Sequence, residues 1–434
     1  MRGQETLNAE RQTLNTPAGV VEGALELRAS VVGLKPPAFV AEQSPRAPAL
    51  ASRQGVTLEE YGQSPRASAR GKAPTPSYPS RASARRGQPR NSGIFRTVAL
   101  LLLLGTLSLT QHAAAQGVSK VGTTAADFLQ IDVGPRAVAM GGAFVAGVDD
   151  ASALYWNPAG IAHMRGSEMI ASHTEWLADL TFDYLGVGLD FGNAGVAGVS
   201  VTMLSVPDMI VRTVDRQDGT GETFDAADMA LGVSYGRAVT DRFSIGVTAK
   251  YIRQRIWHSE ATGFALDIGT QFRTDFVGGL TIGAVMSNFG SDMKLNGRDL
   301  RTFVDPDPSQ LGNNNRVPAN FELDAAKLPL NFQFGITTTP VNSRLHKVTL
   351  NADALHPNSN NESLNLGIEY GYQERVFLRG GYRGMLLDEA EGGLSGGLGV
   401  HQTLFEGGVA KLDYAFRAGG RLGDVHVVGF GLTF

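Results

Sequence analysis

The sequence has no cysteine among its 434 residues. This absence excludes a disulfide framework and any thiolate metal site, and it also removes the lipid-accepting cysteine of a bacterial lipoprotein. A chain that is held in a membrane would therefore have to be held by its own secondary structure.

Charge and long apolar runs are also scarce. Charged residues make up 18% of the chain and the net charge is −4, so the composition does not indicate a nucleic-acid partner. The long apolar run from Val98 to Leu109 is too short for the roughly 20 residues with which a helix spans a bilayer. If this is a membrane protein, we do not expect it to be helical.

Residues 1–90 are rich in Arg, Pro, Ser and Ala and contain near-copies such as Gln43-Ser-Pro-Arg-Ala47 and Gln63-Ser-Pro-Arg-Ala67. A stretch of this composition cannot bury a core. Two interpretations remain open: an over-extended reading frame or discarded leader, and a genuine disordered extension.

Residues 91–115 have the order of a secretory signal peptide. A basic flank that includes Arg90 and Arg96 precedes the apolar run, and Ala113-Ala-Ala-Gln116 follows it. Small residues at this place predict cleavage after Ala115. The alternative, a buried helix of a soluble domain, does not explain why a basic flank and a cleavage site coincide.

From residue 167 to residue 434 the sequence alternates between apolar and small or polar residues, in segments of about ten. Glycine is abundant, with 54 residues, which is typical of many strands and turns. We count fourteen segments, which start near Ser167, Phe182, Gly195, Met229, Phe243, Gly263, Leu280, Asn331, Lys347, Ser363, Val376, Gly393, Gly407 and Val425. The pattern predicts an all-β fold, a fourteen-stranded antiparallel transmembrane β-barrel in contact with outer-membrane lipid.

The connections between these segments give an independent check, because outer-membrane barrels have short periplasmic turns and longer outer loops. The two longest gaps, 207–228 and 291–330, both fall on the side predicted to face outward. The segment that starts at Phe243 does not fit, because Arg253 and Arg255 share the lipid-facing parity. Either its outer half projects beyond the membrane or a bulge shifts its register.

The chain ends in a strand that places Val428, Phe430, Leu432 and Phe434 on one face. A terminal Phe at this place resembles the C-terminal signature that the barrel assembly machinery recognises. We therefore expect Phe434 to act as an assembly signal.

Residues 116–166 lie between the signal peptide and the barrel and are expected to form a plug, or hatch, that closes the inner end of the barrel. They contain Gly134-Pro-Arg-Ala-Val-Ala-Met-Gly-Gly-Ala-Phe-Val-Ala146 and Asp149-Asp-Ala-Ser-Ala-Leu-Tyr-Trp-Asn-Pro-Ala-Gly160. This stretch resembles the N-terminal segment of the PorV/PorQ family, relatives of the FadL long-chain fatty-acid transporters. The resemblance implies a fourteen-stranded barrel with an N-terminal plug.

The resemblance also suggests residues for the ligand path, of which Asn157, Pro158 and Ala159 match the hatch motif of the fatty-acid transporters. Gly160 departs from the Lys that we associate with PorV itself, which puts a cargo-carrying role in doubt. Physical chemistry offers another interpretation, since Asn-Pro favours turns and Gly141-Gly142 permits close packing. The candidate plug or ligand-path residues are Arg136, Gly141, Gly142, Asp149, Asp150, Tyr155, Trp156, Asn157, Pro158, Ala159 and Gly160.

Charged plug residues have to find partners inside the lumen. Arg136, Asp149 and Asp150 are expected to pair with one another or with barrel residues such as Arg379 and Arg383, in a structural network rather than a catalytic one.

Other motifs do not indicate chemistry. Gly393-Leu-Ser-Gly-Gly397 fits the pattern of a nucleophilic serine, but it lies in a glycine-rich strand. Asp305-Pro-Asp307-Pro-Ser309 lacks the Gly and Glu of a calcium loop, and the eight His residues show no close metal-ligand spacing. We expect no metal, no cofactor and no enzymatic activity.

Three functions from different classes are compared. They are a component of protein secretion of type IX, with secretion components or secreted cargo as partners, a channel for hydrophobic ligands such as long-chain fatty acids, and an outer-membrane hydrolase. The hydrolase ranks last because no nucleophile and base are paired in the sequence. We expect a secretion component, because the plug resembles PorV/PorQ more than the fatty-acid transporters.

The signal-peptide interpretation makes a direct prediction. The mature protein should begin at or near Gln116, because processing removes everything up to Ala115. N-terminal sequencing of the protein from the outer-membrane fraction measures this start. Retention of residues 1–90 in that fraction would contradict the prediction.

Overall fold

The computed structural model describes residues 120–434, except 277, 310–313, 315, 388–391 and 406. The predicted leader (1–90) and signal peptide (91–115) lie outside the described residues, and their boundaries stay predictions. Among the described residues, no helix is both long and apolar enough to cross a membrane.

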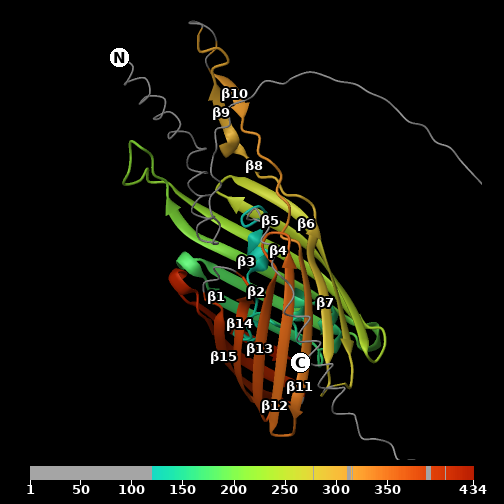
Figure 1. The fold of residues 1–434 in the computed structure, drawn as a ribbon. Coiled ribbons are helices and arrows are strands. Elements are labelled where there is room, and N and C mark those ends of the chain that lie inside the picture. Colours follow the sequence, from blue (N-terminus) through green and yellow to red (C-terminus); the bar gives the residue numbers. More distant parts are fainter. Residues whose placement is uncertain (1–119, 277, 310–313, 315, 388–391, 406) are drawn as a thin grey trace, which may run out of the picture. The chain divides into compact units, whose positions relative to one another are not determined.

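Fourteen strands pair in one antiparallel sheet that closes on itself (Figure 1). The first strand pairs with the last, from Glu168 opposite Thr433 to Glu175 opposite His426. The strands are β1 (Glu168–Glu175), β2 (Thr181–Asp190), β3 (Val196–Ile210), β4 (Thr223–Ala238), β5 (Phe243–Ile256), β6 (Ser259–Arg273), β7 (Thr281–Gly290), β11 (Asn331–Asn342), β12 (His346–Pro357), β13 (Ser363–Tyr372), β14 (Val376–Met385), β15 (Leu394–Phe405), β16 (Gly408–Arg417) and β17 (Val425–Thr433). The predicted fourteen-stranded antiparallel barrel is confirmed.

The two faces of each strand differ as the alternation predicts. On β13, Ile368 and Tyr372 are exposed on the outer wall, whereas Asn365 and Glu369 are buried in the lumen. Apolar side chains on the outer wall suit lipid contact, and polar ones inside suit a filled lumen.

Short connections gather at the end of the barrel where Phe434 lies, and we call this the inner end. The turns there include 191–195, 343–345 and 373–375. Long connections leave the opposite, outer end, where the longest carries a separate hairpin (Figure 1). The smaller elements of the connections are η3 (Leu177–Asp179), η4 (Gly192–Ala194), β8 (Asn296–Gly297), η5 (Arg298–Leu300), β9 (Arg301–Val304), β10 (Val317–Asn320) and η6 (Gly420–Leu422).

All predicted strand starts except two lie within one residue of the observed ones. The exceptions are β4 and β6, which begin at Thr223 and Ser259 rather than at Met229 and Gly263. Their outer ends extend with β5 as a paired sheet, so part of the expected loop 207–228 is strand. The registers of β4 with β5 and of β5 with β6 show no shift, which excludes the bulge considered for β5. The outward-facing Arg253 instead pairs with Glu260 at 2.6 Å, and Arg255 pairs with Asp225.

The segment before β1 folds into four short helical turns inside the barrel. These are η1 (Asp127–Gln130), α4 (Pro135–Ala139), α5 (Ala153–Trp156) and η2 (Pro158–His163). Side chains of this segment form much of the buried core, including Met140, Phe144, Leu154 and Ile161. The lumen is therefore packed with the protein's own chain.

Residues 135–164 make one circuit of the lumen, and inward-facing glycines of the strands create the room for it. A Cβ atom on Gly429 of β17 would lie 2.6 Å from Pro135, one on Gly381 of β14 would lie 2.2 Å from Met140, and one on Gly246 of β5 would lie 2.2 Å from Pro158. At Gly381 and Gly246 the atom met is backbone and at Gly429 it is the proline ring, and contacts this close leave no space for a side chain. We call residues 135–164 the circuit. Glycines on which an added Cβ atom would contact an atom of the circuit lie on eleven strands: Gly188, Gly198, Gly236, Gly246, Gly269, Gly283, Gly335, Gly367, Gly381, Gly397 and Gly429.

The close contacts at the inward glycines predict that alanine is tolerated much better at an outward strand position than at an inward one. Gly246→Ala should destabilise the barrel by about 1–3 kcal/mol or more, because the new methyl group overlaps the Pro158 carbonyl. Gly380→Ala, on the outer wall of β14, is the matched control, since its Cβ would meet Ile368 at an ordinary 3.7 Å. The temperature at which the folded band disappears on a detergent gel measures both. Equal temperatures for the two variants would contradict a tightly seated circuit.

Candidate functional site

Gly141 and Gly142 form the turn that follows α4. Both have a positive φ, of 68° and 74°, which side chains rarely adopt. A Cβ on Gly141 would also lie 2.7 Å from the backbone nitrogen of Tyr382. Backbone geometry alone therefore explains why glycine occupies both positions.

Asn157 is fully buried against the wall of the barrel. Its Nδ2 donates to the carbonyls of Val145 at 2.9 Å and Thr270 at 3.2 Å, and its Oδ1 accepts from Ala159 N at 3.1 Å. Pro158 then starts η2, while Gly160 is packed against Val148 and Ala153. A ligand that touched Asn157 would have to break these bonds, so the geometry favours a structural role for the Asn-Pro motif.

Tyr155 and Trp156 tie the circuit to the chain that precedes it. The Tyr155 hydroxyl lies 2.8 Å from the Leu129 carbonyl and 2.7 Å from the Ile131 carbonyl. Trp156 Nε1 donates to the Val133 carbonyl at 2.9 Å. Both aromatic rings therefore point into the core with their polar atoms satisfied.

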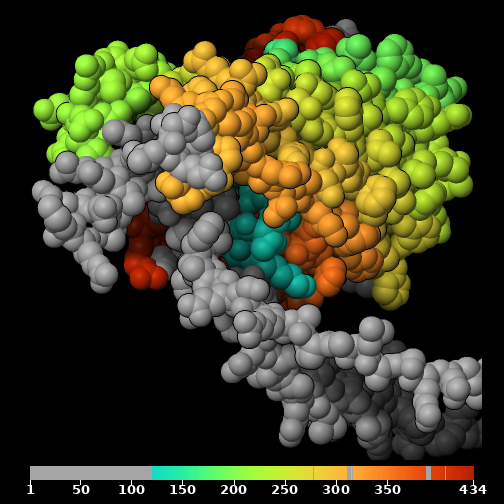
Figure 2. Space-filling view, turned by 90° about the horizontal axis from the view of Figure 1, so that it is seen from above, coloured from blue at the N-terminus to red at the C-terminus, as the bar shows by residue number. Residues whose placement is uncertain are grey.

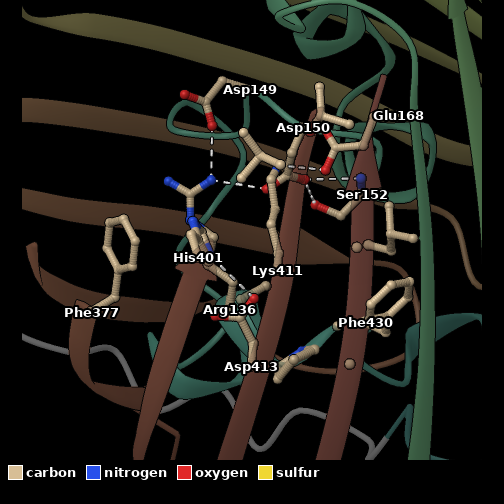
Figure 3. A pocket seen from close by; sticks show the side chains of 18 of the residues that line it. Arg136, Asp149, Asp150, Ser152, Glu168, Phe377, His401, Lys411, Asp413 and Phe430 are labelled. Atoms are coloured by element: carbon tan, nitrogen blue, oxygen red, sulfur yellow. Dashed lines mark hydrogen bonds and ion pairs between the residues drawn. The ribbon is translucent and has the colours of Figure 1, made fainter. Parts of the chain in front are cut away.

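A network of charged side chains lies toward the inner end of the lumen (Figure 3). Arg136, at its centre, contacts Asp149 at 2.8 Å, Asp150 at 2.9 Å and Glu369 of β13 at 3.0 Å. The predicted pairing within the plug is thus present. The same guanidinium also joins the plug to the barrel.

The network continues along the wall. Arg379 of β14 is fully buried and contacts Glu369 at 2.7 Å and Asp413 of β16 at 2.5 Å. On the other side of the cavity, Lys411 contacts Glu168 at 2.5 Å. Buried charges that are paired in this way stabilise one arrangement, since removing one partner leaves the other uncompensated.

The two barrel residues expected as partners of Asp149 and Asp150 contact other carboxylates. Arg379 contacts barrel carboxylates, and Arg383 contacts Asp132 of the segment before the circuit. Arg417 of β16 contacts the same Asp132 at 2.9 Å. Of the two alternatives expected for Asp149 and Asp150, the structure therefore shows pairing within the plug, with Arg136, rather than pairing with Arg379 or Arg383.

Three carboxylates that join the plug to the barrel are missing from the predicted residues, namely Asp132, Asp353 and Glu369. Asp353 of β12 accepts from Phe144 N at 2.7 Å and Val145 N at 2.9 Å. A carboxylate at an inward position of a barrel strand could have indicated Asp353. No local pattern indicates Asp132.

The charged network borders a cavity of about 440 Å³ near the inner end of the barrel. Its lining includes Arg136, Glu168, Arg379, Lys411 and Asp413, together with Phe377. A second cavity, of about 180 Å³, lies on the outer side of the circuit and is rich in carboxamides such as Asn288, Asn331 and Gln333. Both cavities can hold water or polar groups, and no group of three or more metal-ligating side chains occurs in the described part of the chain.

Other predicted residues have ordinary surroundings. Ser395, in the nucleophile-like motif, donates to the Ala139 carbonyl at 3.1 Å inside β15. Phe434 is 53% exposed on the outer wall, and its backbone pairs with Ser167. Its role as an assembly signal stays a prediction.

The pKa of Asp150 leads to a prediction about acid stability. Burial alone would raise this pKa, but the charges of Arg136 and Lys411, together with hydrogen bonds from Ser152 and Arg136, lower it to about 2. A carboxyl whose pKa is depressed in the folded state stabilises the fold above its unfolded pKa, near 4, and this stability is lost as the pH falls toward 2.

We therefore expect wild type to exceed Asp150→Asn in stability by about 2 kcal/mol at pH 6, and the difference to vanish near pH 2. Detergent-gel unfolding temperatures across this pH range measure both proteins, and Asp215→Asn, on an exposed outer loop, is the control. A difference that does not depend on pH would contradict the ionised pair.

The family described as Type IX secretion system protein PorV matches residues 113–335, which is just over half of the chain. No curated protein sequence matches the chain.

Several solved structures are similar in part. The CymD monoaromatic hydrocarbon channel is 13% identical with a TM-score of 0.43, covering 70% of this chain and 97% of that one. The Pseudomonas putida toluene transporter TodX is 10% identical with a TM-score of 0.44, covering 69% and 96%. A Pseudomonas aeruginosa FadL homologue is 12% identical with a TM-score of 0.41, covering 70% and 98%. By the extent of the family match, this chain belongs to the PorV family of type IX secretion system proteins.

Proposed function

We propose that this protein is an outer-membrane component of type IX secretion, and that it acts through its outer surface rather than as a channel. Membership of the PorV family supports the secretion role. The filled lumen supports the mode of action.

The observation that carries the proposal is the seating of residues 135–164. Backbone contacts with inward glycines, the bonds of Asn157 and the ion pairs of Arg136 hold this segment along its length. Opening the lumen would break many of these contacts together. The circuit therefore acts as a permanent plug, and the candidate ligand-path residues serve mainly to build it.

The cavities beside the plug also argue against a path for hydrophobic compounds. Such a path needs mostly apolar walls. The outer cavity is lined mainly by polar groups, among them Asn and Gln side chains. The wall of the inner cavity is mostly apolar in area, but Arg136, Glu168 and Lys411 also border it. Moving an apolar molecule past these groups would desolvate them without replacing their hydrogen bonds.

The outer hairpin of β9 and β10 offers a surface for a protein partner. Phe303 is 59% exposed and Val304 is 46% exposed, and the Arg316 guanidinium lies 4.8 Å from the centre of the Phe303 ring. Exposed aromatic and Arg side chains are enriched at protein interfaces. Secretion components or secreted cargo are the partners that the family suggests.

One observation favours the alternative, a channel for hydrophobic ligands. The outer half of the lumen is lined by buried apolar side chains that include Phe182, Leu204 and Ile252. In this structure the protein's own Phe128 and Leu129 belong to the same cluster. A channel would require these side chains to leave.

The two functions separate in a strain that lacks the gene and carries variants. Replacing residues 301–320 by a short Gly-Ser linker should reduce the secreted proteome while barrel levels stay normal, because it removes the exposed hairpin. Shortening the other long outer loop, residues 212–221, is the matched control and should leave secretion close to wild type. Mass spectrometry of the culture medium measures the effect.

Uptake of long-chain hydrophobic compounds is measured in the same strains. A deletion strain with an intact secreted proteome and lost uptake would overturn the proposal. So would a normal secreted proteome in the hairpin variant.

A further inference from the structure

The residues that precede the circuit, 120–133, differ from it in how they are held, and we call them the strap. Among the described glycines of the barrel strands, none makes room for the strap as eleven do for the circuit. The strap is held by apolar burial, by Asp132 and by a few hydrogen bonds. It can therefore be displaced at lower cost than the circuit.

The upper part of the strap lies beside the outer loop 291–330. Thr124 forms a parallel bridge with Lys327, and Ala125 N donates to the Lys327 carbonyl at 2.8 Å. Ala126 N donates to Gln254, near the outer end of β5, at 2.9 Å. In the view from the outer side, teal residues of this part of the chain are visible in a recess beside the orange loop (Figure 2). The plug segment expected at the inner end therefore also reaches the outer side of the lumen.

Apolar burial joins the strap to the base of the same loop. Phe128, Leu129, Ile131 and Val133 are each at most 5% exposed. They belong to one cluster with Met293 and Leu328, near the two ends of loop 291–330. Met293 and Ala326 also exchange backbone hydrogen bonds of 2.8 Å, which close the loop at its base.

We propose that the strap couples the lumen to the outer loop. It places the N-terminal end of the described chain on the outer side of the membrane, and it holds the base of loop 291–330. Displacing the strap frees this loop and opens an apolar cavity in the outer half of the lumen. The proposal concerns the strap and the loop, and it stands whatever partner the loop binds.

The absence of cysteine makes the topology directly measurable, because any introduced thiol is unique. Thr123→Cys, at the exposed start of the strap, should react with a membrane-impermeant maleimide in intact cells. Asp215→Cys in the outer loop 211–222 should behave in the same way. Asn193→Cys in an inner turn should react only after the outer membrane is permeabilised. If Thr123→Cys, like Asn193→Cys, reacted only after the outer membrane is permeabilised, the outward topology would be overturned.

Coupling is measured by trypsin added to intact cells, since the loop contains Lys294, Arg298, Arg301 and Arg316. The double variant Phe128→Ala with Ile131→Ala should speed cleavage of the loop at least tenfold, because it empties the cluster that holds the base. Val121→Ala, at an exposed position of the strap, should cleave at the wild-type rate. Heat-modifiable gel migration shows that each barrel is folded.

A disulfide provides the reverse test. Thr124→Cys with Lys327→Cys, introduced into the double alanine variant, should restore slow cleavage when oxidised and lose it on reduction, because bridge partners lie close enough for a disulfide. Cleavage that is unchanged by the alanine substitutions, or by reduction of this disulfide in folded barrels, would overturn the coupling.

Discussion

The close approach of two backbones, strand and plug, is the constraint on which the rest of this structure depends. Residues 135–164 pass glycines on eleven strands, and at positions such as Gly246, Gly283 and Gly381 a Cβ atom would meet the backbone of the circuit itself. Each of these glycines costs strand stability. The packed plug offsets that cost by burying side chains such as Met140 and Phe144.

Charges inside the lumen follow from the same constraint. Once the plug backbone lies on the wall, its polar groups and its charged side chains need partners there. Asp353 accepts the backbone N–H groups of Phe144 and Val145, and Glu369 accepts from Arg136. The plug and the barrel therefore stabilise each other, and a conducting path through this region would have to break both sets of bonds. This is the physical reason to place the function on the outer surface.

Different parts of the fold were predictable to different degrees. Strand positions followed from alternation because each β-strand shows its two faces locally, as Ile368 and Glu369 do. The early starts of β4 and β6 were missed, because their outer ends leave the apolar band and carry polar residues such as Asp225 and Glu260. The pairing of Arg136 with Asp149 and Asp150 was predictable from sequence proximity and opposite charge.

The sequence by itself determined the barrel, its strand number and the family, because these depend on local periodicity and short motifs. Only the tertiary structure decided which charges meet, since Arg136 finds Glu369, and Asp132 finds Arg383 and Arg417, across more than 200 residues of chain. It also decided that Asn157 donates a hydrogen bond to Thr270 of the barrel wall, and that the strap reaches the outer loop at Lys327. Such contacts depend on how the strands close around the plug, and no local pattern in the sequence encodes them.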